Sequence, residues 1–416
     1  MTAKAKWKER GTRALLVLSS LLIGCVLVFA AGEAYFRIRW NAGRHSAGPG
    51  WYVPHDQRGW ALKPGDYTRF LPGVFREVRV SINSLGFRDR EVSLRPSPGR
   101  PRITILGDSF GFGDSLNAEE RFTEQLQALT GDSIEVVNVS VPGYGTGHEF
   151  LFIKELMDRG YDVGDKLVFV FFTNDVLDNM GLDYGDARRL PRLPAFSVSE
   201  DGELVLVPPV MPEPAEPQPP QRRPIHRRVY GWIKHRAFSY FLRERATSLA
   251  GRYPWVVRLL ERCGAKLAPN RTPAVVVAWY SDGWQERWDT TKDILKYVAH
   301  YDGFGSTEVV VAFIPSSLQV ERTIQILAER FSARDPRYAE LLRDPDRPQR
   351  ELREFCEDSG IPFIDTTAAL REASLESPAY YLREGHLNAF GSKHVAGALH
   401  RWLLSEGIGA ADRGGE

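Results

Sequence analysis

The stretch Ile103-Thr104-Ile105-Leu106-Gly107-Asp108-Ser109-Phe110 joins a short apolar run to a small-residue turn that carries a serine. The apolar run predicts a buried strand, and the turn after it puts the Ser109 hydroxyl at the C-terminal edge of that strand. In open α/β sheets the loops at this edge face a common crevice in which ligands bind. A serine in a turn is not evidence of catalysis by itself, so the interpretation depends on what else the chain brings to this edge.

Strand and helix patterns alternate around this stretch. The patterns predict strands at 102–106, 134–139, 166–172, 308–314 and 361–364, and helices at 117–129, 146–159, from about 289, 317–331, 346–358 and 389–404. Five strands interleaved with helices indicate an α/β fold with a doubly wound, largely parallel sheet.

The N-terminal region has the pattern of a membrane anchor. Residues 14–32 form an uncharged apolar run that is long enough to cross a bilayer as a helix. The basic residues Lys4, Lys6, Lys8, Arg10 and Arg13 precede this run. The positive-inside rule therefore predicts a cytoplasmic N-terminus and an extracytoplasmic body, periplasmic or extracellular. A lipidation signal at Cys25 and a cleavable signal peptide are the alternatives to an uncleaved single-pass anchor, and all three imply an exported body.

The alternation breaks after the third strand. Residues 181–290 form a predicted insertion with a hairpin at 195–207, a proline-rich linker at 208–224 and a basic amphipathic helix within 225–249. Such a helix can lie on a lipid surface, but packing on its own domain with a solvated charged face is the favoured interpretation. The predicted parts are a tail at 1–13, the transmembrane helix at 14–32, a membrane-proximal segment at 33–98, the α/β domain at 99–180 and 291–406, the insertion at 181–290 and a flexible tail at 407–416.

Composition excludes several classes of protein. The 416 residues carry a formal net charge of +1, with 43% apolar and 26% charged residues, so nucleic acid is not expected as the main partner. Cys25, Cys263 and Cys356 fit neither a disulfide framework nor a zinc site. A single bridge between Cys263 and Cys356 stays open, although unpaired buried thiols are favoured. Since no His, Asp and Glu residues have metal-ligand spacing, neither a metal nor another cofactor is expected.

Three further positions follow strands or lie in the last loop of the predicted fold. Gly143 follows the second strand, Asn174 follows the third, and His386 precedes the C-terminal helix. Right-handed crossovers bring these loops to the edge that carries Ser109. Serine attack on an ester needs a base, an acid that orients the base, and donors for the oxyanion. His386 can be the base and Glu384 the orienting carboxylate. The backbone N–H groups of Ser109 and Gly143 and the side-chain amide of Asn174 can be the donors.

These residues match the motif blocks of the SGNH (GDSL) hydrolase superfamily, which the chain resembles over roughly 100–180 and 290–405. Ser109 matches the block I serine, Gly143 the block II glycine, Asn174 the block III asparagine and His386 the block V histidine. The chain looks most like the bacterial, membrane-anchored members with an Asn-Ser-Leu-Gly-Phe-Arg lead-in, as at 83–88 here. The resemblance implies a flavodoxin-like SGNH hydrolase fold and a serine nucleophile.

The acid departs from the family pattern. The family usually has an aspartate two or three residues before the histidine, whereas this chain has Glu384 and Arg383 there. Glutamate can orient an imidazole as aspartate does, but its extra methylene changes the geometry. Asp365, just past the last predicted strand, is the alternative acid, although a turn residue is the favoured interpretation. For His148, near Gly143, a structural role is favoured over a place in the pocket.

The implied reaction is hydrolysis of an O-acyl ester, with acetyl as the favoured acyl group. Transfer of the acyl group to a glycan hydroxyl uses the same residues, and extracytoplasmic anchoring favours an acylated cell-surface or secreted glycan as substrate. A membrane partner that supplies acyl groups is left open. A non-catalytic glycan-binding or assembly protein is a third interpretation. The pattern Gly-x-Ser-x-Gly at 107–111 also occurs in α/β-hydrolases, but here the serine follows the first strand and the acid and histidine share a loop.

Overall fold

The computed structural model describes residues 3–40, 50–71, 76–181, 194–199, 201–207, 238, 241, 242, 245, 276, 278–333, 335–382 and 384–408. Cys263, the proline-rich stretch and most of the basic segment lie outside these residues. The predictions about them therefore stay predictions, and so does the bridge between Cys263 and Cys356.

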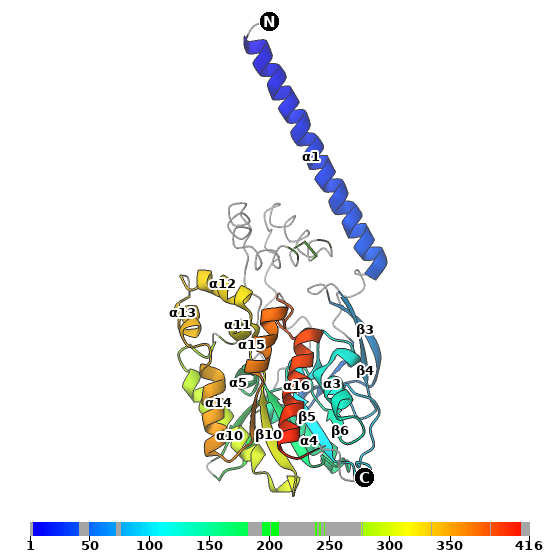
Figure 1. Cartoon of the computed structure of the whole chain (residues 1–416), viewed down its shortest axis with the longest axis vertical. Coiled ribbons are helices and arrows are strands. Elements are labelled where there is room, and N and C mark those ends of the chain that lie inside the picture. Colours follow the sequence, from blue (N-terminus) through cyan, green and yellow to red (C-terminus); the bar gives the residue numbers. More distant parts are fainter. Residues whose placement is uncertain are drawn as a thin grey trace, which may run out of the picture.

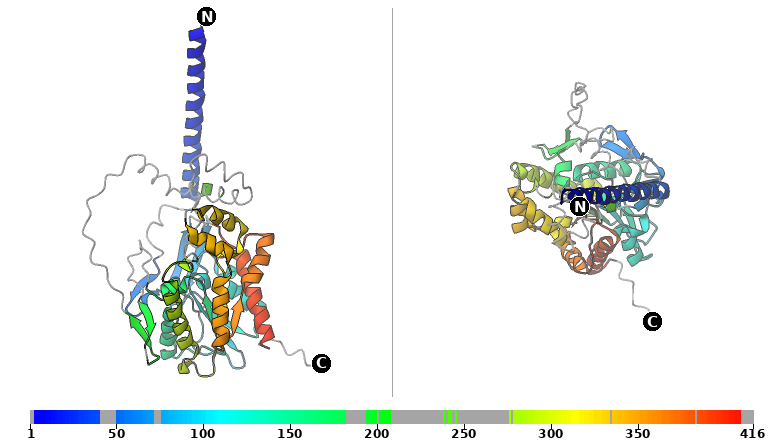
Figure 2. Two further views of the ribbon diagram at one scale, coloured as in Figure 1. Left: turned by 90° about the vertical axis from the view of Figure 1, so that its left-hand side faces the viewer. Right: turned by 90° about the horizontal axis from the view of Figure 1, so that it is seen from above.

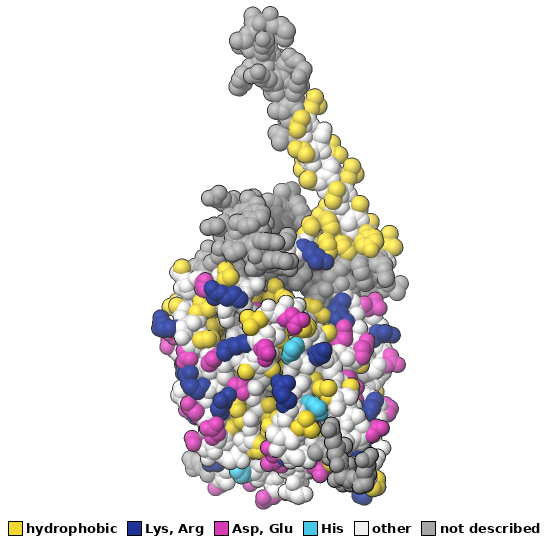
Figure 3. Space-filling model, in the orientation of Figure 1, with side chains coloured by type: hydrophobic (Ala, Val, Ile, Leu, Met, Phe, Trp, Pro, Cys, Tyr) yellow, Lys and Arg dark blue, Asp and Glu magenta, His cyan; other side chains and the backbone are white. Residues whose placement is uncertain are grey.

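The first element is a long helix, α1 (Ala3–Trp40), which extends away from the rest of the chain (Figures 1 and 2). Its most apolar window is Ser19–Phe36, with a mean hydropathy of 1.7 and only 11% of the window buried. Apolar side chains line its surface in Figure 3. Among the described helices, α1 is the one that is long and apolar enough to cross a membrane. It begins before and ends after the predicted span 14–32.

The body is built on one parallel sheet. Its strands are β5 (Arg102–Gly107), β6 (Glu135–Asn138), β7 (Lys166–Phe171), β10 (Glu308–Phe313) and β11 (Phe363–Asp365). They lie in the order β11-β10-β7-β5-β6, and all neighbours are parallel. This is the flavodoxin-like order, with β5 as first strand. The predicted doubly wound α/β fold is confirmed.

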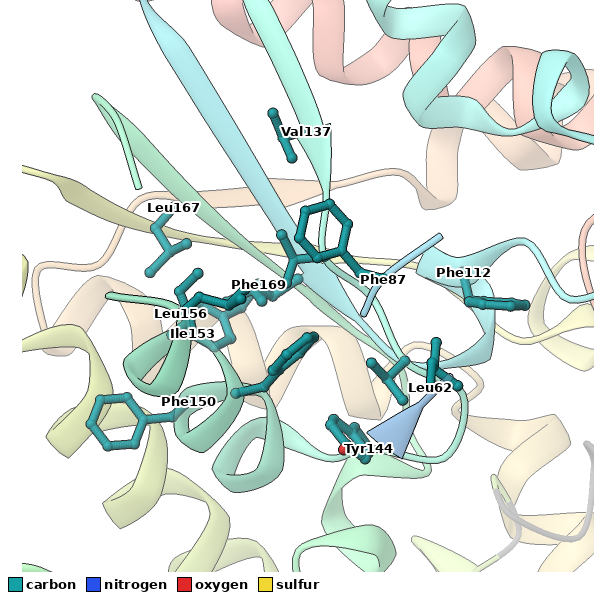
Figure 4. Close-up of a cluster of buried hydrophobic side chains, with 14 of the residues drawn as sticks. Leu62, Phe87, Phe112, Val137, Tyr144, Phe150, Ile153, Leu156, Leu167 and Phe169 are labelled. Carbon is teal, nitrogen blue, oxygen red and sulfur yellow. The ribbon is translucent and has the colours of Figure 1, made fainter. Parts of the chain in front are cut away.

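Helices cover both faces of the sheet because side chains alternate along each strand. Ile103 and Ile105 of β5 contact the cluster formed with α3 (Phe122–Thr130), α15 (Thr367–Glu376) and α16 (Ala389–Ser405). Leu106, on the other face, belongs to the cluster with α4 (Thr146–Asp158) and α10 (Trp284–Ala299) (Figure 4). The remaining helices are α2 (Ser109–Phe112), α5 (Asp175–Asp178), α11 (Ser317–Val320), α12 (Arg322–Phe331), α13 (Pro336–Arg343) and α14 (Arg347–Asp358), with 3-10 turns η1 (Ala118–Glu120) and η2 (Asp302–Phe304).

The segment before the sheet forms two antiparallel hairpins. They are β1 (Tyr52–His55) with β2 (Gly59–Leu62), and β3 (Gly65–Leu71) with β4 (Arg76–Ile82). Along β4 buried and more exposed residues alternate, which is the pattern of a strand with one face on a core. Leu62 and Phe87 belong to the same hydrophobic cluster as Leu106 and Phe112, and Figure 4 shows Leu62, Phe87 and Phe112. The membrane-proximal segment thus shares its hydrophobic core with the sheet.

The structure also contains elements that the sequence patterns do not predict. Helices α13 and α15 are additional, and the predicted helix 317–331 is divided into α11 and α12 by Glu321, whose backbone is extended. The predicted hairpin at 195–207 is present as β8 (Ala195–Val198) and β9 (Leu204–Val207).

Candidate active site

Ser109 is the first residue of the short helix α2, directly after β5. Asp108 caps this helix, because its Oδ1 accepts the N–H of Phe110 at 2.7 Å. A Cβ on Gly111 would lie 2.2 Å from Ser140 Oγ, so only glycine allows the turn to pack against the loop after β6. The turn that carries Ser109 is therefore held by a helix cap on one side and by close backbone packing on the other.

The loop before α16 brings His386 to Ser109. His386 Nε2 lies 2.8 Å from Ser109 Oγ, and its Nδ1 hydrogen-bonds with Glu384 Oε1. The N–H of His386 also donates to Glu384 Oε2 at 3.1 Å. Gly385, between the two, has a φ of +93°, a conformation that glycine adopts without strain. The geometry is that of a serine-hydrolase triad, with nucleophile, base and orienting acid in hydrogen-bond contact.

The surroundings of His386 favour its charged form. Burial lowers the pKa of this imidazole, but the carboxylates of Glu384, Asp114 and Asp108 together outweigh burial and raise the pKa to about 9. The Phe110 ring lies against the imidazole, with 4.9 Å between ring centroids. An imidazole with this pKa loses its proton, and so becomes able to accept one, as the pH rises toward 9.

Asp365 lies elsewhere. It ends β11, the edge strand that is separated from β5 by β10 and β7. Its Oδ2 accepts a hydrogen bond from Arg353 at 2.6 Å, and its Oδ1 accepts the N–H of Thr367 at 2.8 Å. The structure thus brings Glu384 to His386 and gives Asp365 the role of a turn residue at the start of α15.

The predicted oxyanion donors differ in how they are engaged. Gly143 has a φ of +80°, and a Cβ there would lie 2.9 Å from the Trp60 ring. The backbone N–H groups of Ser109 and Gly143 donate no loop or turn hydrogen bond within the described residues. By contrast, the Asn174 amide nitrogen donates to Asp108 at 2.9 Å and to Asp178 at 2.7 Å. The role of all three as oxyanion donors stays a prediction.

Buried carboxyl groups surround Asn174. Asp108, Glu149, Asp175 and Asp178 are each at most 2% exposed. Burial raises the pKa of all four, and the groups raise one another further, with Asp108 acting on the other three. Protons are therefore retained in this cluster to a higher pH than isolated carboxylates would allow.

A small cavity of about 10 Å³ lies beside the triad, and Ser109, His386, Asp114 and Arg121 are among the residues that line it. This is about the space that one water molecule needs. Ligand atoms of Asp114, Glu384 and His386 lie within 4.8 Å of one another, a grouping that the sequence spacing did not reveal. Arg69 donates to Asp114 at 2.6 Å, so the carboxylate of Asp114 already has a cationic partner. This contact fits an ion pair better than a metal site.

Sequence reasoning missed the arginine that supports the nucleophile loop. Arg88 is buried and donates to the carbonyl oxygens of Phe112, Gly113 and Leu116, at 3.1, 2.7 and 2.6 Å. Burial and the neighbouring Arg121 lower the pKa of Arg88 to about 9. The signal was the lead-in that ends at Arg88, which the sequence analysis used only for the family resemblance.

His148 has a structural role. It is fully buried at the start of α4, where its ring hydrogen-bonds with the Pro194 carbonyl at 3.0 Å and lies against Phe196. Burial lowers the pKa of His148 to about 3, so it is neutral at physiological pH.

Comparison with known proteins gives structural similarities only. No family model matches the chain, and no curated protein matches it. A member of the lipolytic G-D-S-L family from Veillonella parvula has 13% identity and a TM-score of 0.32, over 75% of this chain and 98% of that one. An acetylxylan esterase from Geobacillus stearothermophilus has 12% identity and a TM-score of 0.33, over 72% of this chain and 93% of that one.

Similarities of this size add no argument, so the assignment depends on the chain's own features. These features are the sheet order, the succession of Ser109, Gly143, Asn174 and His386 along the chain, and the contacts of the serine with histidine and glutamate. In fold, motif order and site geometry, the chain resembles the SGNH (GDSL) hydrolases.

Proposed function

We propose that this chain is a membrane-anchored serine esterase that hydrolyses O-acyl esters, acetyl esters above all, of a cell-surface or secreted glycan. The observation that carries the proposal is the 2.8 Å contact between Ser109 Oγ and His386 Nε2, with Glu384 on the opposite ring nitrogen. A hydroxyl in contact with an oriented base is the arrangement that nucleophilic catalysis on esters requires.

In the proposed reaction Ser109 Oγ attacks the ester carbonyl and its proton moves to His386 Nε2. The tetrahedral intermediate places its negative oxygen near the three predicted donors, the backbone N–H groups of Ser109 and Gly143 and the side-chain amide of Asn174. It then collapses to the acyl-serine, and the alkoxide leaving group takes the proton from His386. A water molecule, deprotonated by the same imidazole, then attacks the acyl-serine and releases the carboxylic acid.

Location supports a surface glycan as substrate. The anchor α1 ends at Trp40 and the body begins at Gly50, and the chain between them can extend to at most about 35 Å. The body would therefore stay close to the membrane. The basic residues before the span support a cytoplasmic N-terminus and an extracytoplasmic body.

Acyl transfer is the second candidate, because the acyl-serine can be attacked by a glycan hydroxyl in place of water. Transfer requires an acyl donor, which a membrane partner would supply. A non-catalytic glycan-binding or assembly role is the third candidate. The intact contact between Ser109 and His386 supports catalysis over that role.

The test uses the full-length protein in detergent. Wild type should react with a fluorophosphonate probe and hydrolyse p-nitrophenyl acetate, whereas Ser109→Ala should lose both activities without a change in circular dichroism. Ser93→Ala, at an exposed serine, is the matched control and should behave as wild type. Undiminished turnover by Ser109→Ala would refute the assignment of the nucleophile.

Adding an oligosaccharide acceptor separates hydrolysis from transfer. Mass spectrometry of the products should show free acetate and no acetylated acceptor if water is the natural nucleophile. Acetylated oligosaccharide that depends on Ser109 would replace the esterase proposal with the transferase.

A further inference from the structure

We propose that the ion pair between Arg69 and Asp114 is part of the active site, because it holds beside His386 a carboxylate whose charge the arginine partly offsets, and so helps to set the proton affinity of that base. The inference rests on the proposed function of His386 as general base. It makes the hairpin next to the membrane anchor a part of the active site.

The geometry places Asp114 beside the triad. Its N–H donates to the carbonyl oxygen of Ser109 at 3.1 Å, so the residue is fixed to the nucleophile's own turn. A carboxylate oxygen of Asp114, a carboxylate oxygen of Glu384 and a ring nitrogen of His386 lie within 4.8 Å of one another. Asp114 is thus an acidic neighbour of the imidazole in addition to Glu384, the carboxylate that the triad needs.

Arg69 reaches this carboxylate from a different part of the chain. It belongs to β3, and its Nη1 donates to Asp114 Oδ1 at 2.6 Å. The Asp114 side chain is 12% exposed and that of Arg69 is 30% exposed, so solvent only partly screens the pair. Burial lowers the pKa of Arg69, but Asp114 and more weakly Glu384 raise it, which means that the guanidinium stays charged next to the triad.

The other charged groups near His386 come from several elements. Glu384 and Tyr381 lie in its own loop, Asp108 caps α2, and Arg121 lines the same small cavity. Asp108 accepts hydrogen bonds from Phe110 and Asn174. Asp114 thus lies near the imidazole but outside the loop that carries His386. Its charge is offset by Arg69 of the N-terminal hairpin.

The consequence is electrostatic. Without Arg69, the full negative charge of Asp114 would act on His386 and stabilise the imidazolium, so the base would become neutral only at higher pH. Without Asp114, the imidazolium would lose a stabilising neighbour and the base would become neutral at lower pH. The two single variants therefore shift the acidic limb of the pH profile in opposite directions, which a purely structural role of the pair cannot do.

The test compares Arg69→Gln, Asp114→Asn and the double variant in full-length protein. The acidic limb of kcat/KM for p-nitrophenyl acetate should move up by about half to one pH unit in Arg69→Gln and down by a similar amount in Asp114→Asn. At pH 7, turnover should therefore be about three- to tenfold slower in Arg69→Gln and about three- to tenfold faster in Asp114→Asn. Arg79→Gln, at an exposed arginine of the same hairpin, should keep the wild-type profile.

A second measurement does not depend on turnover. The imidazole resonances of carbon-13-labelled His386, identified by comparison with His386→Ala, should titrate with the same opposite shifts in the two variants. The inference would be overturned if the acidic limb of the pH profile and the His386 resonances of the variants coincided with those of wild type. Equal losses of rate at every pH would also overturn it. Absence of activity in wild type with the expected shifts in the resonances would instead refute the proposed function and leave the ion pair standing.

Discussion

Two groups of carboxylates lie near Ser109, and they differ in what surrounds them. Glu384 and Asp114 are partly exposed and each contacts a side chain that can carry positive charge, His386 or Arg69. Asp108, Glu149, Asp175 and Asp178 are buried, and hydroxyl, amide or backbone N–H groups donate hydrogen bonds to Asp108, Asp175 and Asp178. Environment thus separates carboxyl groups paired with a side chain that can carry positive charge from buried carboxyl groups whose pKa burial raises.

Among the carboxylates near Ser109, the largest effect is expected when Glu384 loses its charge. Glu384→Gln should lower kcat by about 10²–10⁴, because the imidazole loses both its orienting partner and the stabilisation of its charged form. Glu384→Asp should keep substantial activity. Steady-state kinetics on p-nitrophenyl acetate measures both.

Asp365→Asn is the matched control for Glu384→Gln. It removes a carboxylate that accepts hydrogen bonds from Arg353 and Thr367, so it should leave kcat unchanged and lower only the melting temperature. If Asp365→Asn were inactive and Glu384→Gln normal, the acid of the triad would have to be reassigned.

Asn174 belongs with the buried group, since its amide donates hydrogen bonds to Asp108 and Asp178. Asn174→Ala should lower kcat by about 10²–10³, the usual loss for one oxyanion donor, with a smaller effect on KM. It should also lower the melting temperature because two buried carboxyl groups lose a hydrogen bond. A rise in KM alone would mean that Asn174 binds the ground state.

The smallest effect is expected at Glu149. Burial, with Asp108, raises the pKa of this carboxyl in the folded protein above the value of an unfolded chain. The folded state therefore keeps the proton longer, and the stabilisation is lost as pH rises from about 4.5 toward the folded pKa. Wild type should thus melt at a lower temperature at pH 8 than at pH 5. Glu149→Gln should reduce that difference by a few degrees, and Glu119→Gln, at an exposed position, should not.

Much of the fold could be predicted because the signals are local. Strands β5, β7 and β10 are apolar runs that are buried on both faces, and motif residues follow the ends of β5 and β7. Helix α13 also had local signals, Asp335 as cap and Pro336 in the first turn, but its exposed and polar composition concealed it. The stretch that forms α13 lies outside the motif positions, and its pattern says less about secondary structure.

The site was predictable to the same extent. Ser109, His386 and Glu384 could be placed together because the loops that follow parallel strands meet at one edge of the sheet. The contact of Asn174 with Asp178 could be expected because residues four apart lie on the same face of a helix. Arg69 and Arg88 could not be placed, because their partners depend on how a distant hairpin packs on the sheet. No periodicity or spacing encodes a contact such as that of Arg69 with Asp114.

The contacts across the site also affect when it can form during synthesis. Ser109 and His386 are 277 positions apart, and Arg76 of β4 hydrogen-bonds with Tyr381 across 305 positions. Contacts of this span form late, because a long loop must close before they contribute. A chain that has emerged only as far as β10 can assemble four of the five strands but has no histidine beside its serine. The nascent protein would therefore lack the proposed esterase activity until translation has passed the loop before α16.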